Sequence, residues 1–403
     1  MALLELTENT PAQRVYSGLR WLVVAAVLIA VPYIAHTPAR IDQFTQVGGY
    51  AVALVGLNLV IGYAGQISLG HSAFVGLGAY ITVILVANHH WSYLSTIPVV
   101  LVVCFLVGAV LGLPALRISG LYMAVVTLAI AAIFPVVILK YDGLTGGANG
   151  LLAKDKMIPP SWTPFDARSR FGPVAYRYFV VLTVAVVMFV LAHNVVRGRI
   201  GRAIIALRDN STGAAVSGVN LGVARIVMFG ISAALGGVGG ALLMIQLPQA
   251  TADRFGLDLA IFLVVALFAG GTGTLSGAVP GALIYIFLPY FAIQWGAKVS
   301  FLKGPGAASI SGVIYGILLL VFVFVMPGGV ADGLRRAWAR IVHVTPNPRW
   351  LIRHRKAATD AEQGAQHPTD AEPVAQRPID PPQRVTTTTN HQPPLQSLGE
   401  SQR

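Results

Sequence analysis

Residues 62–80 read GYAGQISLGHSAFVGLGAY, a stretch in which a long apolar run is interrupted by small and polar residues. An uncharged polar side chain that enters hydrocarbon without a partner loses its hydrogen bonds to water at a cost of several kcal/mol. We therefore expect Gln66, Ser68 and His71 to face protein, water or a translocation path rather than lipid. The stretch predicts a membrane helix bundle with a polar interior.

The glycines of the same stretch predict a local break. Gly62 and Gly65 flank Tyr63 and Ala64, which favours a turn between two helical pieces. His71 leaves two interpretations open. It is either a hydrogen-bonded structural residue, as most lone histidines in membrane helices are, or part of a path-lining set with Gln66 and Ser68.

The composition predicts an all-α, polytopic transmembrane protein. Of its 403 residues, 55% are hydrophobic and 11% are charged, against roughly 25% charged in a soluble domain. The apolar runs are continuous rather than alternating, which indicates helices long enough to cross about 30 Å of hydrocarbon. We expect about ten segments, at 20–36, 47–63, 66–87, 96–116, 119–139, 176–196, 226–247, 258–271, 276–295 and 308–326. The eighth is short, which favours a tilted, broken or re-entrant helix.

Charge predicts the organisation of the chain across a cytoplasmic membrane. The formal net charge is +12, and its basic residues lie in loops and tails, which fits lipid headgroups better than nucleic acid. The basic region after 335 places both termini in the cytoplasm, with the 197–225 loop inside and residues 140–175 outside. We expect four parts: a cytoplasmic segment at 1–19, a permease domain at 20–330, a basic cytoplasmic segment at 331–356 and a disordered tail at 357–403.

Small residues at helical spacing predict close helix packing. Helices in lipid associate where small side chains let their backbones approach, because lipid tails are as apolar as leucine. Gly236 and Gly240 are four residues apart, and Gly273, Gly277 and Gly281 form a run of three at the same spacing. Such spacing indicates a tightly packed bundle and no particular activity.

The 197–225 loop contains a short amphipathic helix. Ile200, Ile204 and Leu207 share one face, and Arg202 and Asp209 lie opposite. Two interpretations are open from spacing alone: a helix that lies on the lipid headgroups, or a helix that docks into a groove of a partner protein. Turn or cap positions are expected at Gly213, Gly218 and Gly222.

Six blocks in sequence resemble the LivM-type permease subunits of branched-chain amino acid ABC transporters. They are GLNLVIGYAGQISLGHSAFVGLGAY (56–80), GLYMAVVTLA (120–129), YDGLTGGANGL (141–151), GRAIIALRDNSTGAAVSGVNLGVARIVMFGISAALGGVGGALL (201–243), GGTGTLSGAVPGA (270–282) and MPGGVADGL (326–334). The resemblance covers roughly 45–335 and implies an importer permease. It also implies three kinds of partner: a LivH-type permease, two cytoplasmic ATPase subunits and an extracytoplasmic substrate-binding protein.

The resemblance further implies that residues 201–220 form the loop that docks on the ATPase. The family pattern carries over onto Arg202, Ala206, Arg208, Asp209, Asn210, Ala214, Gly218 and Asn220. The chain departs from the pattern in several places. No glutamate stands at 211 or 212, Gly213 replaces an alanine, and Ser276 and Ala278 stand where Trp and Pro are common. These departures leave open which residue makes the main ATPase contact.

The chain lacks the motifs that competing functions require. It has no G-x-x-x-x-G-K-[ST] loop, so ATP is expected to be hydrolysed by other subunits. No nucleophile–base pair or metal-spaced cluster predicts an enzyme, a cofactor or a metal site. Two alternatives to a branched-chain amino acid permease stay open: a urea or short-chain amide ABC permease, and a stand-alone secondary carrier or channel.

Overall fold

The computed structural model describes most of the chain up to residue 345. The described residues are 4–7, 11–35, 37–116, 120–153, 157–161, 163, 165–166, 169, 171–298, 316 and 328–345. The predicted tail at 357–403 and nearly all of the predicted segment 308–326 lie outside them.

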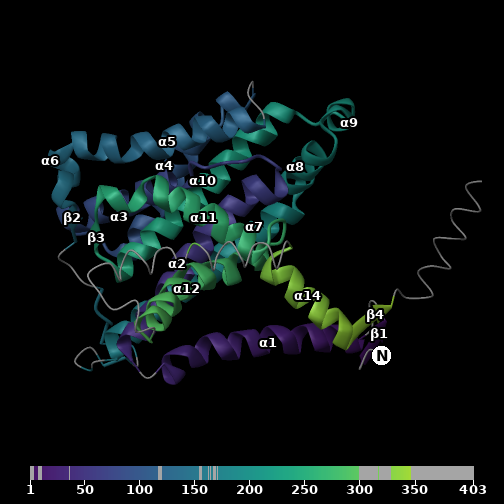
Figure 1. The fold of residues 1–403 in the computed structure, drawn as a ribbon, viewed down its shortest axis with the longest axis horizontal. Helices are drawn as coiled ribbons and strands as arrows, with labels where there is room; N and C mark the ends of the chain where they lie inside the picture. Colours follow the sequence, from purple (N-terminus) through teal and green to yellow (C-terminus); the bar gives the residue numbers. More distant parts are fainter. Residues whose placement is uncertain are drawn as a thin grey trace, which may run out of the picture. The chain divides into compact units, whose positions relative to one another are not determined.

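Helices dominate the described part (Figure 1). In chain order the longer elements are β1 (Leu4–Thr7), α1 (Pro11–Ile34), α2 (Pro38–Asn58), α3 (His71–His89), α4 (Tyr93–Leu111), α5 (Leu121–Lys140), α7 (Gly172–Arg197), α8 (Arg199–Asp209), α10 (Leu221–Gln246), α11 (Leu257–Gly270), α12 (Ala278–Lys298), α14 (Gly329–Ile341) and β4 (Val342–Thr345). The short ones are α6 (Asp142–Thr145), β2 (Leu151–Leu152), α9 (Ser211–Val216) and β3 (Gln249–Ala250). Loops carry five further turns, η1 (Leu59–Tyr63), η2 (Pro114–Leu116), η3 (Gly147–Asn149), η4 (Ala252–Phe255) and η5 (Leu275–Gly277).

The expected number of about ten membrane segments is not confirmed. Six helices of the described residues are long and apolar enough to cross a membrane: α2 with η1, α3, α4, α5, α7 and α10. The eighth and ninth predicted segments form α11 and α12, which meet at a bend of 118°. They therefore make one broken or re-entrant unit. A broken or re-entrant helix was among the forms expected from the short length of segment 258–271. The first predicted segment is the apolar part of α1, Leu22–Ile34.

Helix α10 occupies the centre of the bundle, where it packs against α2, α3 and α4. Small residues permit this close packing. A side chain at Gly236 would come within 2.8 Å of the His71 imidazole, and one at Gly240 would overlap the carbonyl of Val75. The hydroxyl of Ser232 donates a 2.7 Å hydrogen bond to the Gly56 carbonyl on α2. These contacts make α10 the scaffold on which α2 and α3 are held.

The two ends of α10 carry different structures (Figure 1). At its start lie α8 and α9, and at its end β3 pairs antiparallel with β2, with Leu151 opposite Ala250. At 1.5 Å per residue, the 26 residues of α10 separate these two regions by about 39 Å. The 197–225 loop and residues 141–153 therefore lie at opposite ends of the bundle.

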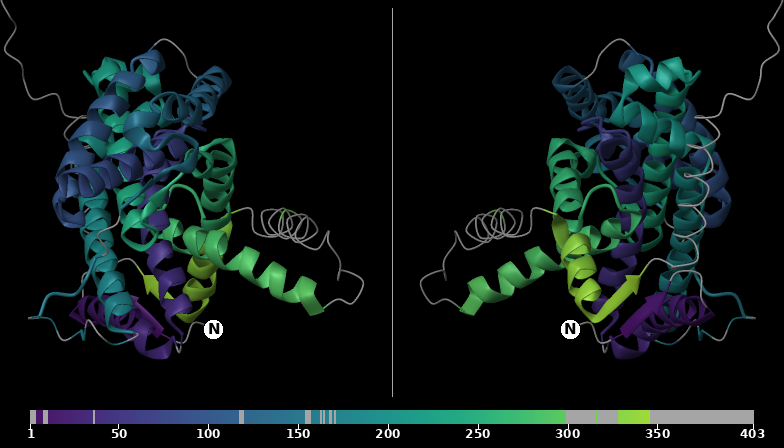
Figure 2. Two further views of the ribbon diagram at one scale, coloured as in Figure 1. Left: turned by 90° about the vertical axis from the view of Figure 1, so that its left-hand side faces the viewer. Right: turned by 90° about the vertical axis from the view of Figure 1, so that its right-hand side faces the viewer.

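The first and last described segments meet (Figure 2). Strand β1 pairs in parallel with β4, with Leu4 opposite Val342 and Thr7 opposite Thr345. Helix α14 leads into β4, and Gly329 at its start packs directly against Gly271, in the bend between α11 and α12. The start of α14, which belongs to the sequence block 326–334, therefore contacts the bend between α11 and α12.

Candidate functional site

The end of α2 contains the break expected from Gly62 and Gly65. After Asn58 the helix widens into the π-helical turn η1, and the chain then runs without helix until α3 begins at His71. Gly65 has a φ of +66°, a conformation that L side chains rarely adopt. A π-turn in an α-helix often marks a functional site. The break lies between two helices that pack on α10.

Asn58 ties this break to the bend between α11 and α12. Its side chain is fully buried, donates to the Thr274 carbonyl at 2.7 Å and accepts from the Gly273 amide at 2.9 Å. Gly273 has a φ of +76° and lies in the turn rather than on a helix. Both backbone groups of the turn are therefore satisfied by one buried amide on α2, as buried polar groups must be.

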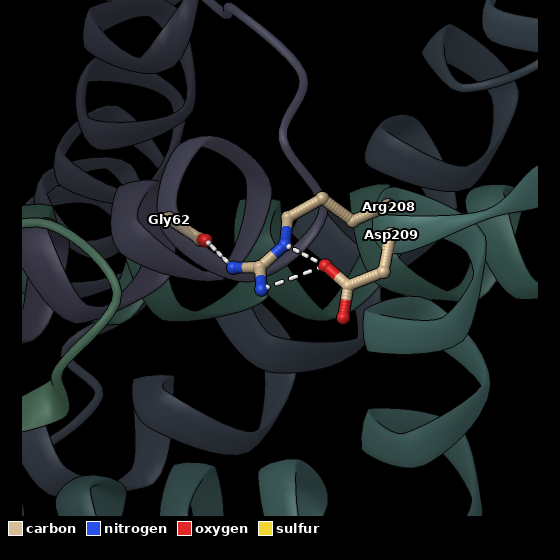
Figure 3. A network of polar contacts seen from close by, with 3 residues as sticks. All are labelled: Gly62, Arg208 and Asp209. Carbon is tan, nitrogen blue, oxygen red and sulfur yellow. Dashed lines mark hydrogen bonds and ion pairs between the residues drawn. The ribbon is translucent and has the colours of Figure 1, made fainter.

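Arg208 ties the same break to α8 (Figure 3). Its Nη1 donates to the Gly62 carbonyl at 2.9 Å, while Nε donates to Asp209 Oδ1 at 2.9 Å. A side chain at Gly65 would come within 2.7 Å of Arg208 Cγ, so glycine is what allows the arginine to lie across the break. We call Asn58, Gly62, Gly65, Arg208 and Gly273 the junction. It joins α2, α8 and the α11–α12 bend.

Helix α8 forms where the amphipathic pattern predicts it. Ile204 and Leu207 are buried against the bundle, whereas Ile200 is partly exposed, so the predicted apolar face is shorter than expected. Gly218 has a φ of +80° and ends α9, as a cap glycine does. Gly213 and Gly222 lie inside α9 and α10 instead, so their assignment as turn or cap positions is wrong.

The other predicted coupling residues mostly shape this region. Asn210 accepts from the Gly213 amide at 2.9 Å and Asn220 accepts from the Val223 amide at 3.1 Å, so each caps the helix that follows it. Arg202 donates to the last carbonyl of α7, at Arg197. Ala214 is buried and Ala206 half-buried beneath the exposed face of α8 and α9.

The most exposed apolar side chain of α8 and α9 had no signal in the sequence pattern. Val216, the last residue of α9, is 86% exposed. Ile200 on α8 and Val223 at the start of α10 are exposed as well, at 39% and 56%. The neighbours of Val216 in sequence are polar or small, so the hydrophobic periodicity did not single it out.

The structure separates the three residues predicted to line a path. His71 is only 2% exposed, and its Nε2 lies 2.9 Å from the Ala53 carbonyl on α2, so it joins α3 to α2. Ser68 is equally buried. Gln66 is partly exposed, and its backbone amide donates to the Val60 carbonyl at 3.0 Å. These contacts fit a structural role for His71 and leave Gln66 as the accessible member.

A groove that sequence reasoning missed lies on the opposite half of α2. It has a volume of about 470 Å³ and is lined by residues of α2, α11 and α12, namely Gln43, Gln46, Tyr50, Phe262, Tyr285, Ile286 and Pro289. The Tyr50 and Tyr285 rings meet edge-to-face with their centroids 4.6 Å apart. Nothing in the residue pattern brings α2 and α12 together, so the groove was not predictable from spacing.

No group of three or more His, Cys, Asp or Glu side chains with metal-binding geometry occurs among the described residues. The titratable side chain of the junction is that of Arg208, which pairs with Asp209 at the surface. The junction holds three backbone segments together, at the end of α2, in α8 and in the α11–α12 bend.

Comparison with known proteins identifies the family of the chain. The family model described as "Branched-chain amino acid transport system / permease component" matches residues 40–323, which is more than half of the chain. LivM, a high-affinity branched-chain amino acid transport system permease protein of Salmonella typhimurium, is 26% identical over 66% of this chain and 66% of its own length. The alignment thus spans just under two thirds of that relative.

Two further relatives differ in their described cargo. BraD of Pseudomonas aeruginosa, a high-affinity branched-chain amino acid transport system permease protein, is 27% identical over 74% of this chain and 97% of its own length. MglC of Escherichia coli, a galactose/methyl galactoside import permease protein, is 29% identical over 66% of this chain and 84% of its own length. No solved structure matches the chain.

Proposed function

This chain belongs to the family of permease components of branched-chain amino acid transport systems, and we propose that it is a membrane-spanning subunit of an ATP-driven importer for branched-chain amino acids. The family match over residues 40–323 carries this proposal, together with relatives described as LivM and BraD. In this proposal the scaffold of the conduit includes the bent pair and the six helices of the described residues that are long and apolar enough to cross a membrane.

The energy for transport comes, in this proposal, from two separate cytoplasmic ATPase subunits. The sequence holds no phosphate-binding P-loop. The exposed face of α8 and α9 is the surface offered to an ATPase, with Val216 as its apolar anchor and Arg202 and Asp209 as its polar surroundings. A LivH-type permease would complete the conduit, and an extracytoplasmic substrate-binding protein would deliver the solute.

The proposed orientation places α8 and α9 in the cytoplasm and residues 140–175 outside the cytoplasmic membrane. Arginines in 197–225 favour the cytoplasmic side, and the two regions lie at opposite ends of α10. The pairing of β1 with β4 supports termini on a common side. The cytoplasmic segments at 1–19 and 331–356 and the permease domain at 20–330 follow from this orientation.

The junction gives the proposed coupling a physical route. A displacement of α8 by the ATPase acts on the Gly62 carbonyl through Arg208, and Asn58 connects the same turn to the α11–α12 bend. Because α2 ends at the junction and the turn that contains Gly273 leads through η5 into α12, both helices would tilt together. Such a tilt of packed helices converts an outward-open into an inward-open arrangement.

A sugar permease is the second candidate, favoured by the similarity to MglC. Uptake by cells that express the complete transporter separates the two. We expect ATP-dependent uptake of labelled leucine that unlabelled isoleucine and valine inhibit and galactose does not. Uptake of galactose without leucine uptake would identify the sugar permease. Transport by the purified chain alone in liposomes with an ion gradient would contradict both and indicate a secondary carrier.

A further inference from the structure

The open groove between α2, α11 and α12 has room for a small molecule and is lined by both polar and apolar side chains. Its volume of about 470 Å³ lies within the range of about 300–1,000 Å³ that is usual for ligand pockets. Gln43, Gln46, Tyr50 and Tyr285 supply polar groups, and Phe262, Ile286 and Pro289 supply apolar surface. None of these side chains carries a formal charge.

Gln43 shows that the groove is not optimised for stability. Its Oε1 is buried and has no hydrogen-bond partner among the described residues. A buried acceptor left without a donor costs about 1–3 kcal/mol. A leucine of similar size would avoid this cost. The oxygen is closed off from the groove as the side chain stands, and a turn of the terminal amide would bring it to a donor that arrives from outside the chain.

The lining specifies what kind of donor fits. A zwitterionic amino acid carries an ammonium group, which could donate to the Gln43 oxygen after the amide turns toward the groove, and a carboxylate, which can accept from amide or phenol groups. Its net charge is zero, and so is that of the lining, so that no unpaired charge is buried when it binds. An aliphatic side chain would lie on Phe262, Ile286 and Pro289.

We propose that this groove binds the transported solute, a neutral amino acid with an aliphatic side chain, as it passes through the permease. The inference rests on the proposed function and names the site of passage within it. The groove is connected to the junction by α2, since Gln43 and Asn58 are 15 residues, or about 22 Å, apart on one helix. Motion of α8 would therefore reach the groove through α2 and α12.

Replacement of Gln43 by leucine separates ligand binding from folding. For Gln43→Leu in the complete transporter we expect a fall in leucine uptake of about tenfold, with unchanged or higher thermal stability because the unsatisfied acceptor is gone. The matched control is Gln249→Leu, the same exchange on β3, which should keep uptake within about twofold. Wild-type uptake in Gln43→Leu, or a loss explained by less assembled protein, would overturn the proposal.

Cysteine labelling tests occupancy directly. The native Cys104 is buried, so a maleimide should react mainly with a new thiol in Ile286→Cys. In cells that express the complete transporter, leucine should slow this labelling at least threefold. It should not slow labelling of Leu144→Cys, an exposed position on α6 outside the groove. Galactose serves as the ligand control.

The outcomes distinguish a failure of the proposed binding site in the groove from a failure of the proposed importer function. If cells take up leucine but leucine does not slow the labelling of Ile286→Cys, the groove proposal fails while the importer assignment stands. If galactose slows the labelling and leucine does not, the commitment to an amino acid is overturned. If the transporter takes up no leucine at all, the proposed function itself fails.

Discussion

Helix α10 and the α8–α9 segment are neighbours in the chain, but α10 is almost completely buried and α8–α9 is mostly exposed. From Phe229 to Ile245 nearly every residue of α10 is buried, and glycines bring it against the backbones of α2 and α3. In α8 and α9 only Gly201, Ile204, Leu207 and Ala214 are buried. The contrast separates a buried scaffold, where changes should affect folding, from an exposed segment, where the proposed function predicts that changes affect coupling alone.

The largest effect is expected in the scaffold, for Gly240→Ala. The new methyl group would overlap the Val75 carbonyl on α3, and the backbones must separate to make room. Overpacking costs about 1–3 kcal/mol, and more where backbone has to move. The assembled amount of transporter and its thermal stability should fall together. Gly143→Ala is the matched control, because its methyl group would meet open space. Equal stability of the two variants would contradict the account of α10.

The next effect is expected on the exposed segment, for Val216→Asp. Full burial of a valine side chain contributes about 1.5–3 kcal/mol, so its replacement by a charge should weaken ATPase binding at least tenfold. Thermal stability of the permease should not change, because the side chain contacts solvent. Co-purification of the ATPase measures the loss, and Thr212→Asp on the same helix controls for the added charge. If Val216→Asp still binds the ATPase as the wild type does, Val216 is not an anchor of that contact.

A smaller effect on uptake is expected for Asn58→Ala, at the end of α2, where Asn58 bonds the turn between α11 and α12. The substitution leaves the Gly273 amide and the Thr274 carbonyl without their partner, at about 1–3 kcal/mol for a buried group. Part of this cost is recovered if water enters the turn. We expect a lower melting temperature and slower uptake with ATPase binding intact. A variant with normal uptake would show that the α11–α12 bend moves independently of α2.

The smallest effect is expected for Gln66→Ala. Its side chain is partly exposed, so its loss creates little cavity, and a contribution to the path should appear as a two- to threefold change in uptake at constant assembly. His71→Ala should instead reduce assembly, because its bond to the Ala53 carbonyl joins two helices. If the double variant Gln66→Ala, His71→Ala assembles and transports normally, Gln66 and His71 do not line the pathway.

The sequence predicted the features that depend on local pattern. The helical class, the break after Gly62, the position of α8 and the family followed from periodicity, glycine placement and motif order. It did not predict that Arg208 spans the break, because a contact across 146 residues has no local signature. The groove was missed for the same reason: Tyr50 and Tyr285 come from distant segments, and each resembles an ordinary core residue by itself.

In the proposed mechanism, Arg208 transmits the motion of the ATPase to the bundle through the Gly62 carbonyl. The most direct measurement is the number of leucine molecules imported per ATP hydrolysed by the reconstituted transporter that carries Arg208→Ala, beside Arg336→Ala, which removes only a surface ion pair. The account predicts at least a tenfold lower ratio for Arg208→Ala with normal ATPase binding and a wild-type ratio for Arg336→Ala. A wild-type ratio in Arg208→Ala would contradict it.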